Sequence, residues 1–288
     1  MAENDISFDD YAPADIAKKI ESVGIKKANL TFLSLFLLSV LAGAYIAIGG
    51  EFYTLVIFDS NLSFGLTKLI GGLCFSVGLI LVVIAGAELF TGNTLMIMSF
   101  ASRVITWKQL LKHWGVNYIG NFIGSLSVVF IMFLTNQWET KEFMLGAKAV
   151  QIAATKTNLG FVEALANAIL CNALVCLAVW LCFSARTVIS KIAAIIFPIT
   201  AFVASGFEHS IANMYFIPMG IILKNNPKVI EALNKINPNL DISRLNITGL
   251  FGNLLPVTLG NTIGGCIMVG LTYWVIMILP QKRKKTVK

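Results

Sequence analysis

The sequence predicts an all-α integral membrane protein with six transmembrane helices. Only 13% of its 288 residues are charged and 57% are hydrophobic, whereas about a quarter of the residues of a soluble globular protein are charged. Four runs contain no Asp, Glu, Lys, Arg or His: residues 28–50, 114–138, 164–185 and 245–281. Each reaches the ~20 residues that a helix needs to cross a bilayer, so these runs predict transmembrane helices one, three, four and six.

Two further apolar runs are interrupted only near their middles and predict helices two and five. Residues 69–102 contain Glu88 as their one charged residue, and residues 192–223 contain only Glu208 and His209. An ionisable group at membrane depth is costly unless it lines a cavity or finds a partner. Glycine and serine beside such groups are typical of a broken helix at a transport site, so we expect both helices to be broken.

The two halves of the chain resemble each other. Three residues recur at a constant offset of 120 positions, Gly86, Glu88 and Asn93 in the first half and Gly206, Glu208 and Asn213 in the second. A Gly-Asn-x-x-Gly pattern also recurs, at residues 120–124 and 260–264. Three crossings per half orient the halves oppositely, so we expect an inverted three-plus-three repeat with the transport site where the halves meet.

The basic residues predict the orientation. Most Lys and Arg that flank the six segments fall on the side that holds both termini, and cytoplasmic loops carry the excess of basic residues. We therefore expect residues 1–27 to form a cytoplasmic N-terminal segment, residues 28–281 the transmembrane channel domain, and residues 282–288 a basic cytoplasmic tail. The net charge of +7 reflects this topology, so no nucleic-acid partner is expected.

Enzymes, structural scaffolds and water channels fit the sequence less well than a membrane protein with a transport site. The five cysteines lie within apolar runs without a Cys-x-x-Cys pair, the two histidines do not cluster with them, and no Gly-rich phosphate loop occurs. We therefore expect no metal, no cofactor and no enzyme. A structural scaffold has no reason to place Glu88, Glu208 and His209 inside a bilayer. A water or glycerol channel is the nearest rival, but aquaporin Asn-Pro-Ala pairs are absent.

Positions at which the repeats differ indicate function. His209 takes the place of Leu89, and Ile211 takes the place of Thr91. Histidine is the side chain whose ordinary pKa lets its charge change near neutral pH. We interpret His209 as functional; a neutral histidine that only packs is the alternative.

Positions at which the two halves carry the same residue are interpreted as supporting the structure of the two helix breaks. Glu88 and Glu208 are expected to hold the two breaks by accepting hydrogen bonds from backbone N–H groups, where the second half of each helix begins. A proton relay is the alternative role for these carboxylates. Asn93 and Asn213 are expected to tie the broken backbone to neighbouring helices. The partial positive charge of the two half-helix ends would make the midplane attractive to a small anion.

Three stretches carry a resemblance to a known family. Residues 86–93, 171–180 and 204–214 resemble the formate–nitrite transporter family, and the similarity extends from about residue 10 to 280. The resemblance implies a homopentamer of six-helix protomers with an aquaporin-like fold. Each protomer would have its own pore, in the cytoplasmic (inner) membrane of a prokaryote, in contact with membrane lipid.

The resemblance also implies roles for particular residues. His209 resembles the central pore histidine and Thr91 its hydroxyl partner, whereas Lys156 resembles the lysine that draws anions into the outer vestibule. Asn172 resembles a polar residue near that vestibule. Leu79, with Phe75 nearby, resembles the cytoplasmic constriction. The periplasmic-side constriction is expected from Leu89, Val175 and Phe202, and the scaffold of the breaks from Gly86, Glu88, Gly92, Asn93, Gly206, Glu208 and Asn213.

The substrate is expected to be formate, with nitrite or hydrosulfide as alternatives. A bare anion crosses apolar constrictions only at high cost, so a weak acid can pass by taking a proton that His209 supplies or shares. The opposing interpretation keeps His209 protonated as a counter-charge. Glu88 and Gly92 stand where the formate branch tends to have Asp and Ser, which favours the alternatives. Residues 8–27 resemble a helix proposed to gate formate channels at low pH, although a plain surface helix is equally compatible.

Overall fold

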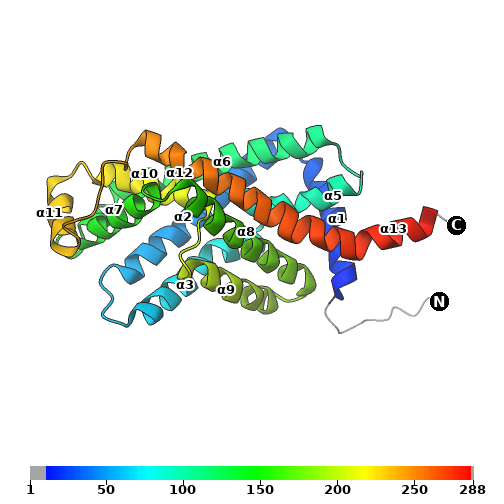
Figure 1. Ribbon diagram of the computed structural model, residues 1–288, viewed down its shortest axis with the longest axis horizontal. Coiled ribbons are helices and arrows are strands. Elements are labelled where there is room, and N and C mark those ends of the chain that lie inside the picture. The colour runs from blue at the N-terminus through cyan, green and yellow to red at the C-terminus, as the bar shows by residue number, and fades with distance from the viewer. Residues whose placement is uncertain (1–10, 287–288) are drawn as a thin grey trace.

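The computed structural model describes residues 11–286, and all regular elements in this range are helices (Figure 1). The α-helices are α1 (Pro13–Ala28), α2 (Phe32–Ile57), α3 (Phe64–Leu81), α4 (Phe90–Asn93), α5 (Ile97–Ala101), α6 (Trp107–Leu134), α7 (Met144–Thr157), α8 (Phe161–Ser184), α9 (Val188–Ala204), α10 (Ser210–Leu223), α11 (Pro227–Ile236), α12 (Ile247–Ile263) and α13 (Leu279–Thr286). Val82–Gly86, Gly264–Leu271 and Trp274–Ile278 continue α3 and α12 as π-helical turns. The all-helical class is as expected.

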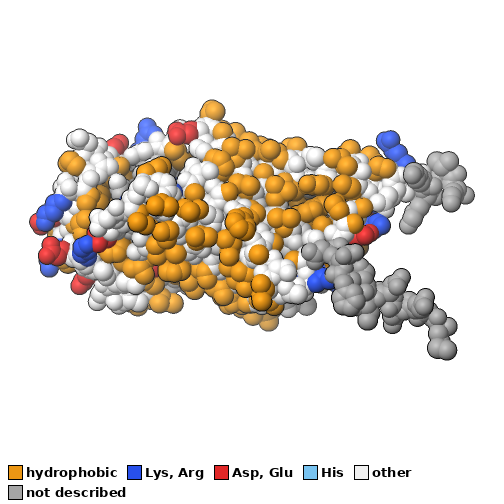
Figure 2. All heavy atoms as spheres, turned by 90° about the horizontal axis from the view of Figure 1, so that it is seen from below, with side chains coloured by type: hydrophobic (Ala, Val, Ile, Leu, Met, Phe, Trp, Pro, Cys, Tyr) orange, Lys and Arg blue, Asp and Glu red, His pale blue; other side chains and the backbone are white. Residues whose placement is uncertain are grey.

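The molecule is elongated, with α1 and α13 at one end and α11 at the other (Figure 1). A broad hydrophobic surface covers the middle of the face in Figure 2, whereas charged side chains gather at the ends. Within the described residues, five helices are long and apolar enough to cross a membrane: Phe32–Ile57, Phe64–Gly86, Trp107–Leu134, Phe161–Ser184 and Ile247–Arg283. The shorter apolar helices α9 and α10 supplement them.

The helical backbone is interrupted at two equivalent places. After Gly86 the chain is extended at Ala87, and α4 begins at Phe90. After α9 it passes through Gly206, and α10 begins at Ser210. Gly86 and Gly206 have φ angles of 84° and 74°, a region that glycine enters without the steric cost of a Cβ. Each glycine thus allows the turn that ends one helix and starts the next.

The two Gly-Asn-x-x-Gly patterns lie at close helix contacts. A Cβ at Gly124 of α6 would overlap the carbonyl group of Val40 in α2. A Cβ at Gly264, just after α12, would overlap the carbonyl group of Ile169 in α8. Small residues let helix backbones approach each other closely in a membrane, so each pattern joins two long helices of one half.

Three helices lie outside the six predicted transmembrane segments. The regions around Lys156 and Lys235 contain α7 and α11, whose buried apolar side chains pack on the bundle. Lys156 thus belongs to the last turn of α7. At the N-terminus, α1 provides a helix within the expected segment 1–27, whereas Phe8, Asp9 and Asp10 lie outside the described residues.

We predict that Gly124→Ala destabilises the protein, because the added methyl group must push α6 away from α2. Overpacking of this kind costs about 1–3 kcal/mol. Gly115→Ala is the matched control in the same helix, where a Cβ meets no neighbour and alanine favours helix by about 1 kcal/mol. In detergent, the midpoint temperature of thermal unfolding should fall below that of the wild type for Gly124→Ala and rise above it for Gly115→Ala. Equal midpoints for the two variants would contradict the close contact.

Candidate functional site

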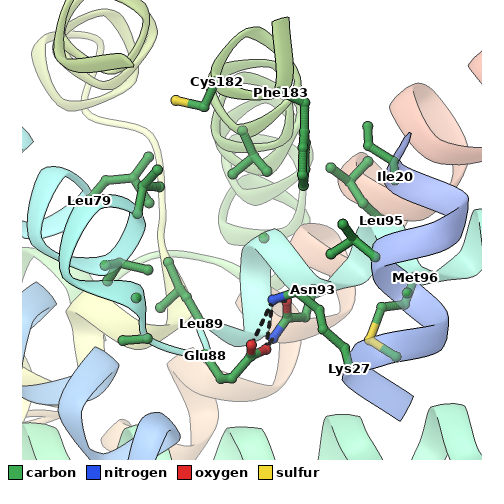
Figure 3. Close-up of a pocket in the computed structure, with 18 of the residues that line it drawn as sticks. Ile20, Lys27, Leu79, Glu88, Leu89, Asn93, Leu95, Met96, Cys182 and Phe183 are labelled. Atoms are coloured by element: carbon green, nitrogen blue, oxygen red, sulfur yellow. Dashed lines mark hydrogen bonds and ion pairs between the residues drawn. The ribbon is translucent and has the colours of Figure 1, made fainter. Parts of the chain in front are cut away.

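Two cavities enter the bundle from opposite ends. The first, here called the α1 cavity, has a volume of about 400 Å³ and is lined by α1 together with the interruption around Glu88 (Figure 3). The second, the α7 cavity, has a volume of about 360 Å³ and is lined by α7 together with the interruption around Glu208. The region between them is the candidate site.

His209 and Thr91 meet in this region. Thr91 Oγ1 lies 3.0 Å from His209 Nε2, and both side chains are buried. Thr91 stands in α4, just after the first interruption, and His209 is the residue that caps the start of α10 after the second. The two interruptions therefore bring together residues 118 positions apart, and His209 lines the α7 cavity from its inner end.

The hydrogen bonds of His209 define which ring nitrogen carries the proton. The backbone N–H of Ala212 donates to Nδ1 at 3.0 Å, so Nδ1 acts as an acceptor. In a neutral ring the proton then resides on Nε2, which can donate to Thr91 Oγ1. The ring also stacks on Phe202, with centroids 5.8 Å apart. This arrangement presents a neutral imidazole at the site.

The carboxylate of Glu88 is held by side chains at the first interruption (Figure 3). Lys27 Nζ, from α1, lies 2.8 Å from both carboxylate oxygens, and Asn93 Nδ2 donates to Oε2 at 2.7 Å. His113 Nε2 lies 3.5 Å from the same oxygen. These four residues are called the first carboxylate cluster.

The carboxylate of Glu208 has a matching environment, the second carboxylate cluster. Lys156 Nζ lies 2.8 Å from Oε1, and Asn213 Nδ2 donates to Oε2 at 2.6 Å. Asn253 Nδ2 lies 3.4 Å from Oε2 and also donates to the carbonyl of Lys156. Both glutamates are thus bound by lysine and asparagine side chains rather than by the backbone N–H groups expected from the sequence.

The broken backbone is tied to its neighbours by Asn121 and Asn261. Asn121 donates to the carbonyl groups of Glu88 and Ser39 and accepts from the N–H of Phe90. Asn261 donates to the carbonyls of Glu208 and Ala168 and accepts from the N–H of Ser210. Asn121 and Asn261 thus share the role expected of Asn93 and Asn213. Besides binding the carboxylates, Asn213 donates to Asn253 Oδ1 of α12, and Asn93 Oδ1 accepts from Lys27 of α1.

Lysines give the α7 cavity a positive lining. Lys68, Lys148 and Lys156 all border it. Burial, together with the charge of Lys68, lowers the pKa of Lys148, as expected where cations crowd together. The Lys156 side chain is only 14% exposed. It is therefore more buried than a lysine in a water-filled vestibule, the position that the resemblance implies. Its charge acts next to Glu208 and 5.5 Å from the ring centre of Phe216.

The apolar residues expected at the constrictions are grouped differently from expectation. Leu79 and Leu89 both line the α1 cavity, whereas Phe75 and Phe202 line the α7 cavity with ring centroids 5.7 Å apart. Phe75 and Leu79 are one helical turn apart, about 6 Å along α3, so they face different cavities. Phe75 and Leu89 therefore exchange places relative to the expected grouping. Val175 is buried in the core of α8.

Asn172 lies beside Thr91 rather than at the α7 cavity. Its Nδ2 donates to the carbonyl groups of Thr91 and Asn261 at 3.2 and 2.6 Å. Because it joins the first interruption to α12, it supports the position of Thr91. Gly92 borders the α1 cavity one residue further on. Residues 11–286 hold no group of three or more His, Cys, Asp or Glu side chains suited to a metal ion.

No role was assigned from the sequence to three cluster residues, Lys27, His113 and Asn253, or to the two asparagines that hold the backbone, Asn121 and Asn261. Asn121 and Asn261 had a signal, because each is a polar residue repeated within an apolar run. Asn253 lies in such a run as well. Lys27 had none, because its approach to Glu88 depends on how α1 docks, 61 residues earlier in the chain.

Sequence comparisons identify close relatives. A family profile described as formate/nitrite transporter matches residues 14–275. Formate channel FocA of Escherichia coli strain K12 is 43% identical, over 95% of this chain and 97% of that protein. A probable formate transporter of Methanothermobacter thermautotrophicus is 36% identical, over 91% of this chain and 96% of that protein.

Solved structures agree with these relatives. A pentameric formate channel with formate bound matches with a TM-score of 0.78 at 44% identity, over 85% of this chain and 97% of that chain. An ion channel of the FNT family matches with a TM-score of 0.77 at 29% identity, over 91% and 98%. The resemblance found in the sequence motifs is therefore confirmed. The chain is a multi-pass membrane protein that belongs to the formate/nitrite transporter family.

Proposed function

We propose that the protein conducts formate across the inner membrane through a pore in each protomer of a homopentamer. The observation that carries the proposal is the His209–Thr91 pair, buried between two cavities that enter from opposite ends. The relatives add support, since those at 43% and 44% identity are formate channels, one of them pentameric with formate bound. The relatives are channels and transporters, so we propose no enzymatic activity.

The proposed path begins at the lysines. Lys68, Lys148 and Lys156 border the α7 cavity and would raise the local concentration of a small anion near the buried site. Phe75 and Phe202 border one cavity, and Leu79 and Leu89 the other. A bare charge is costly between such apolar side chains, so the acid would pass them in its neutral form.

His209 is proposed to hold the acid by a hydrogen bond while a proton from water neutralises the carboxylate. Its Nε2–H points to Thr91 Oγ1, and an arriving carboxylate oxygen could take the place of that hydroxyl as the acceptor. The backbone N–H of Ala212 opposes a proton on Nδ1, which favours this neutral role over a permanently charged histidine. Nitrite or hydrosulfide transport through the same pore is the alternative, because their small weak acids meet the same requirements.

We further propose that the chain forms an inverted three-plus-three repeat with six crossings and an aquaporin-like fold. The matching carboxylate clusters, one toward each cavity, support this assignment. α1 and α13 lie at the same end of the molecule (Figure 1). Together with the basic residues of that end, this supports cytoplasmic termini, with the α1 cavity open to the cytoplasm and residues 28–281 as the channel domain.

Flux into proteoliposomes should be faster for formate than for glycerol between pH 5 and 8, because the site suits a small weak acid, and faster than for nitrite and hydrosulfide, because the relatives at 43% and 44% identity are formate channels. Light scattering or radiolabel uptake measures each rate against empty vesicles. A preference for nitrite or hydrosulfide would change the assigned substrate but not the family. Permeation of glycerol alone would refute weak-acid transport.

Thr91→Val should reduce formate flux by up to about tenfold while the protein stays folded. The substitution keeps the shape but removes the hydroxyl that can hydrogen bond the permeating acid beside His209; one such bond contributes about 0.5–1.5 kcal/mol, and 1.4 kcal/mol corresponds to tenfold in rate. His209→Asn should reduce the pH dependence of uptake or alter its ion selectivity. Unchanged flux and pH profile in both variants would refute the role of the pair.

Lys156→Met should lower the unfolding temperature, because it leaves Glu208 as an unpaired buried charge, a loss of about 3–5 kcal/mol. The double variant Lys156→Met/Glu208→Gln removes both charges and should recover much of that stability. Formate uptake should stay weak in the double variant, since the attracting charge is gone. Full uptake in the folded double variant would show that Lys156 serves only the scaffold.

A further inference from the structure

His113 occupies, in the first carboxylate cluster, the place that Asn253 occupies in the second. Each stands seven residues before the first glycine of a Gly-Asn-x-x-Gly pattern. Asn253 Nδ2 lies 3.4 Å from Oε2 of Glu208, and His113 Nε2 lies 3.5 Å from Oε2 of Glu88. Equivalent positions thus face equivalent carboxylates, but only the first cluster contains a side chain that ordinarily titrates near neutral pH.

The surroundings of His113 leave its hydrogen-bonding capacity unused. The side chain is 2% exposed, and neither ring nitrogen has a hydrogen-bond partner among the described residues. The same holds for both side-chain polar atoms of Asn117, one turn further along α6. A buried polar atom without a partner is destabilising. With a proton on Nε2, His113 would donate to the carboxylate of Glu88, at a distance that needs only a small approach.

The charged groups that face His113 are few. Glu88 contacts it, and Lys27 of α1 binds the same carboxylate. α4, α5 and the first half of α2 contribute no titratable side chain, and Lys112 beside it on α6 is exposed. The other titratable side chains on the elements that pack against α6 are Asp15, Lys18, Lys19, Glu21 and Lys26 of α1, Tyr45, Glu51 and Tyr53 of α2, Tyr215 of α10, and Glu139.

We propose that His113 is a second proton-binding site, which makes the charge beside the α1 cavity depend on the pH of that side. While His113 is neutral, the charges of Lys27 and Glu88 compensate each other. When His113 takes a proton from water, the three side chains together carry one positive charge. Glu88 and Lys27 line the α1 cavity, so that charge would raise the anion concentration there. This proposal rests on the proposed function, because it assumes that the transported substrate is a small anion.

The consequence is an asymmetry between the two ends of the pore. The second cluster holds Asn253 where the first holds His113, so its charge stays constant over the same pH range. Acidification on the α1 side would favour entry of the anion from that side only. With the α1 cavity facing the cytoplasm, formate export would respond to cytoplasmic acid independently of His209.

Formate efflux from proteoliposomes of defined orientation tests the proposal. The pH on the α1 side is varied from 5.5 to 8 while the other side is held constant. The ratio of the efflux at pH 5.5 to that at pH 8 should be smaller in His113→Asn than in the wild type, by on the order of twofold to tenfold for the loss of one charge beside the cavity.

His113→Asn copies the side chain found in the second cluster. If His113→Asn folds poorly, His113→Gln takes its place. Equal ratios in a folded variant would overturn the proposal.

Two further measurements separate this proposal from the transport function itself. The chain contains two histidines, so ring-labelled His209→Asn protein has a single imidazole signal, from His113. Solid-state NMR should show that signal titrating between pH 5 and 8, even if no formate is transported; a signal that stays neutral would overturn the proposal. Asn253→His should add a dependence on the pH of the opposite side, and a folded variant without it would argue against the charge mechanism.

Discussion

Two carboxylates lie inside the helical bundle, and the compensation of their charge is the constraint on which the rest of the architecture depends. Each is bound by one lysine and one asparagine at hydrogen-bond distance. Breaking a buried ion pair leaves an uncompensated charge of high energy. The lysines must therefore reach the two interruptions, and α1 and α7 are the elements that carry them there.

The carboxylate clusters also fix the geometry of the pore. Because Asn121 and Asn261 hold the carbonyl of each glutamate and the N–H two residues later, the short extended segments between half-helices have a defined path. His209 lies within one of these segments and Thr91 follows directly on the other, so their separation is set by backbone that is already hydrogen bonded. A site whose supporting bonds are complete needs little reorganisation when a substrate arrives.

The sequence was sufficient for the helical class, the places of the two interruptions and the pairing of Thr91 with His209, since each depends on hydrophobicity, internal repetition or family motifs. It was insufficient where the outcome depends on docking. Lys27 meets Glu88 only because α1 packs across the end of the bundle. Phe75 and Leu79, expected at one constriction, line different cavities, because a motif does not reveal how one helical turn separates two side chains along the pore.

The order of residues along the chain has a consequence for how the protein is made. Lys27 precedes Glu88 by 61 residues, and Lys156 precedes Glu208 by 52. A ribosome therefore completes each cation before it adds the carboxylate that the cation will neutralise. When either glutamate is added to the chain, the lysine that will neutralise it has already been synthesised.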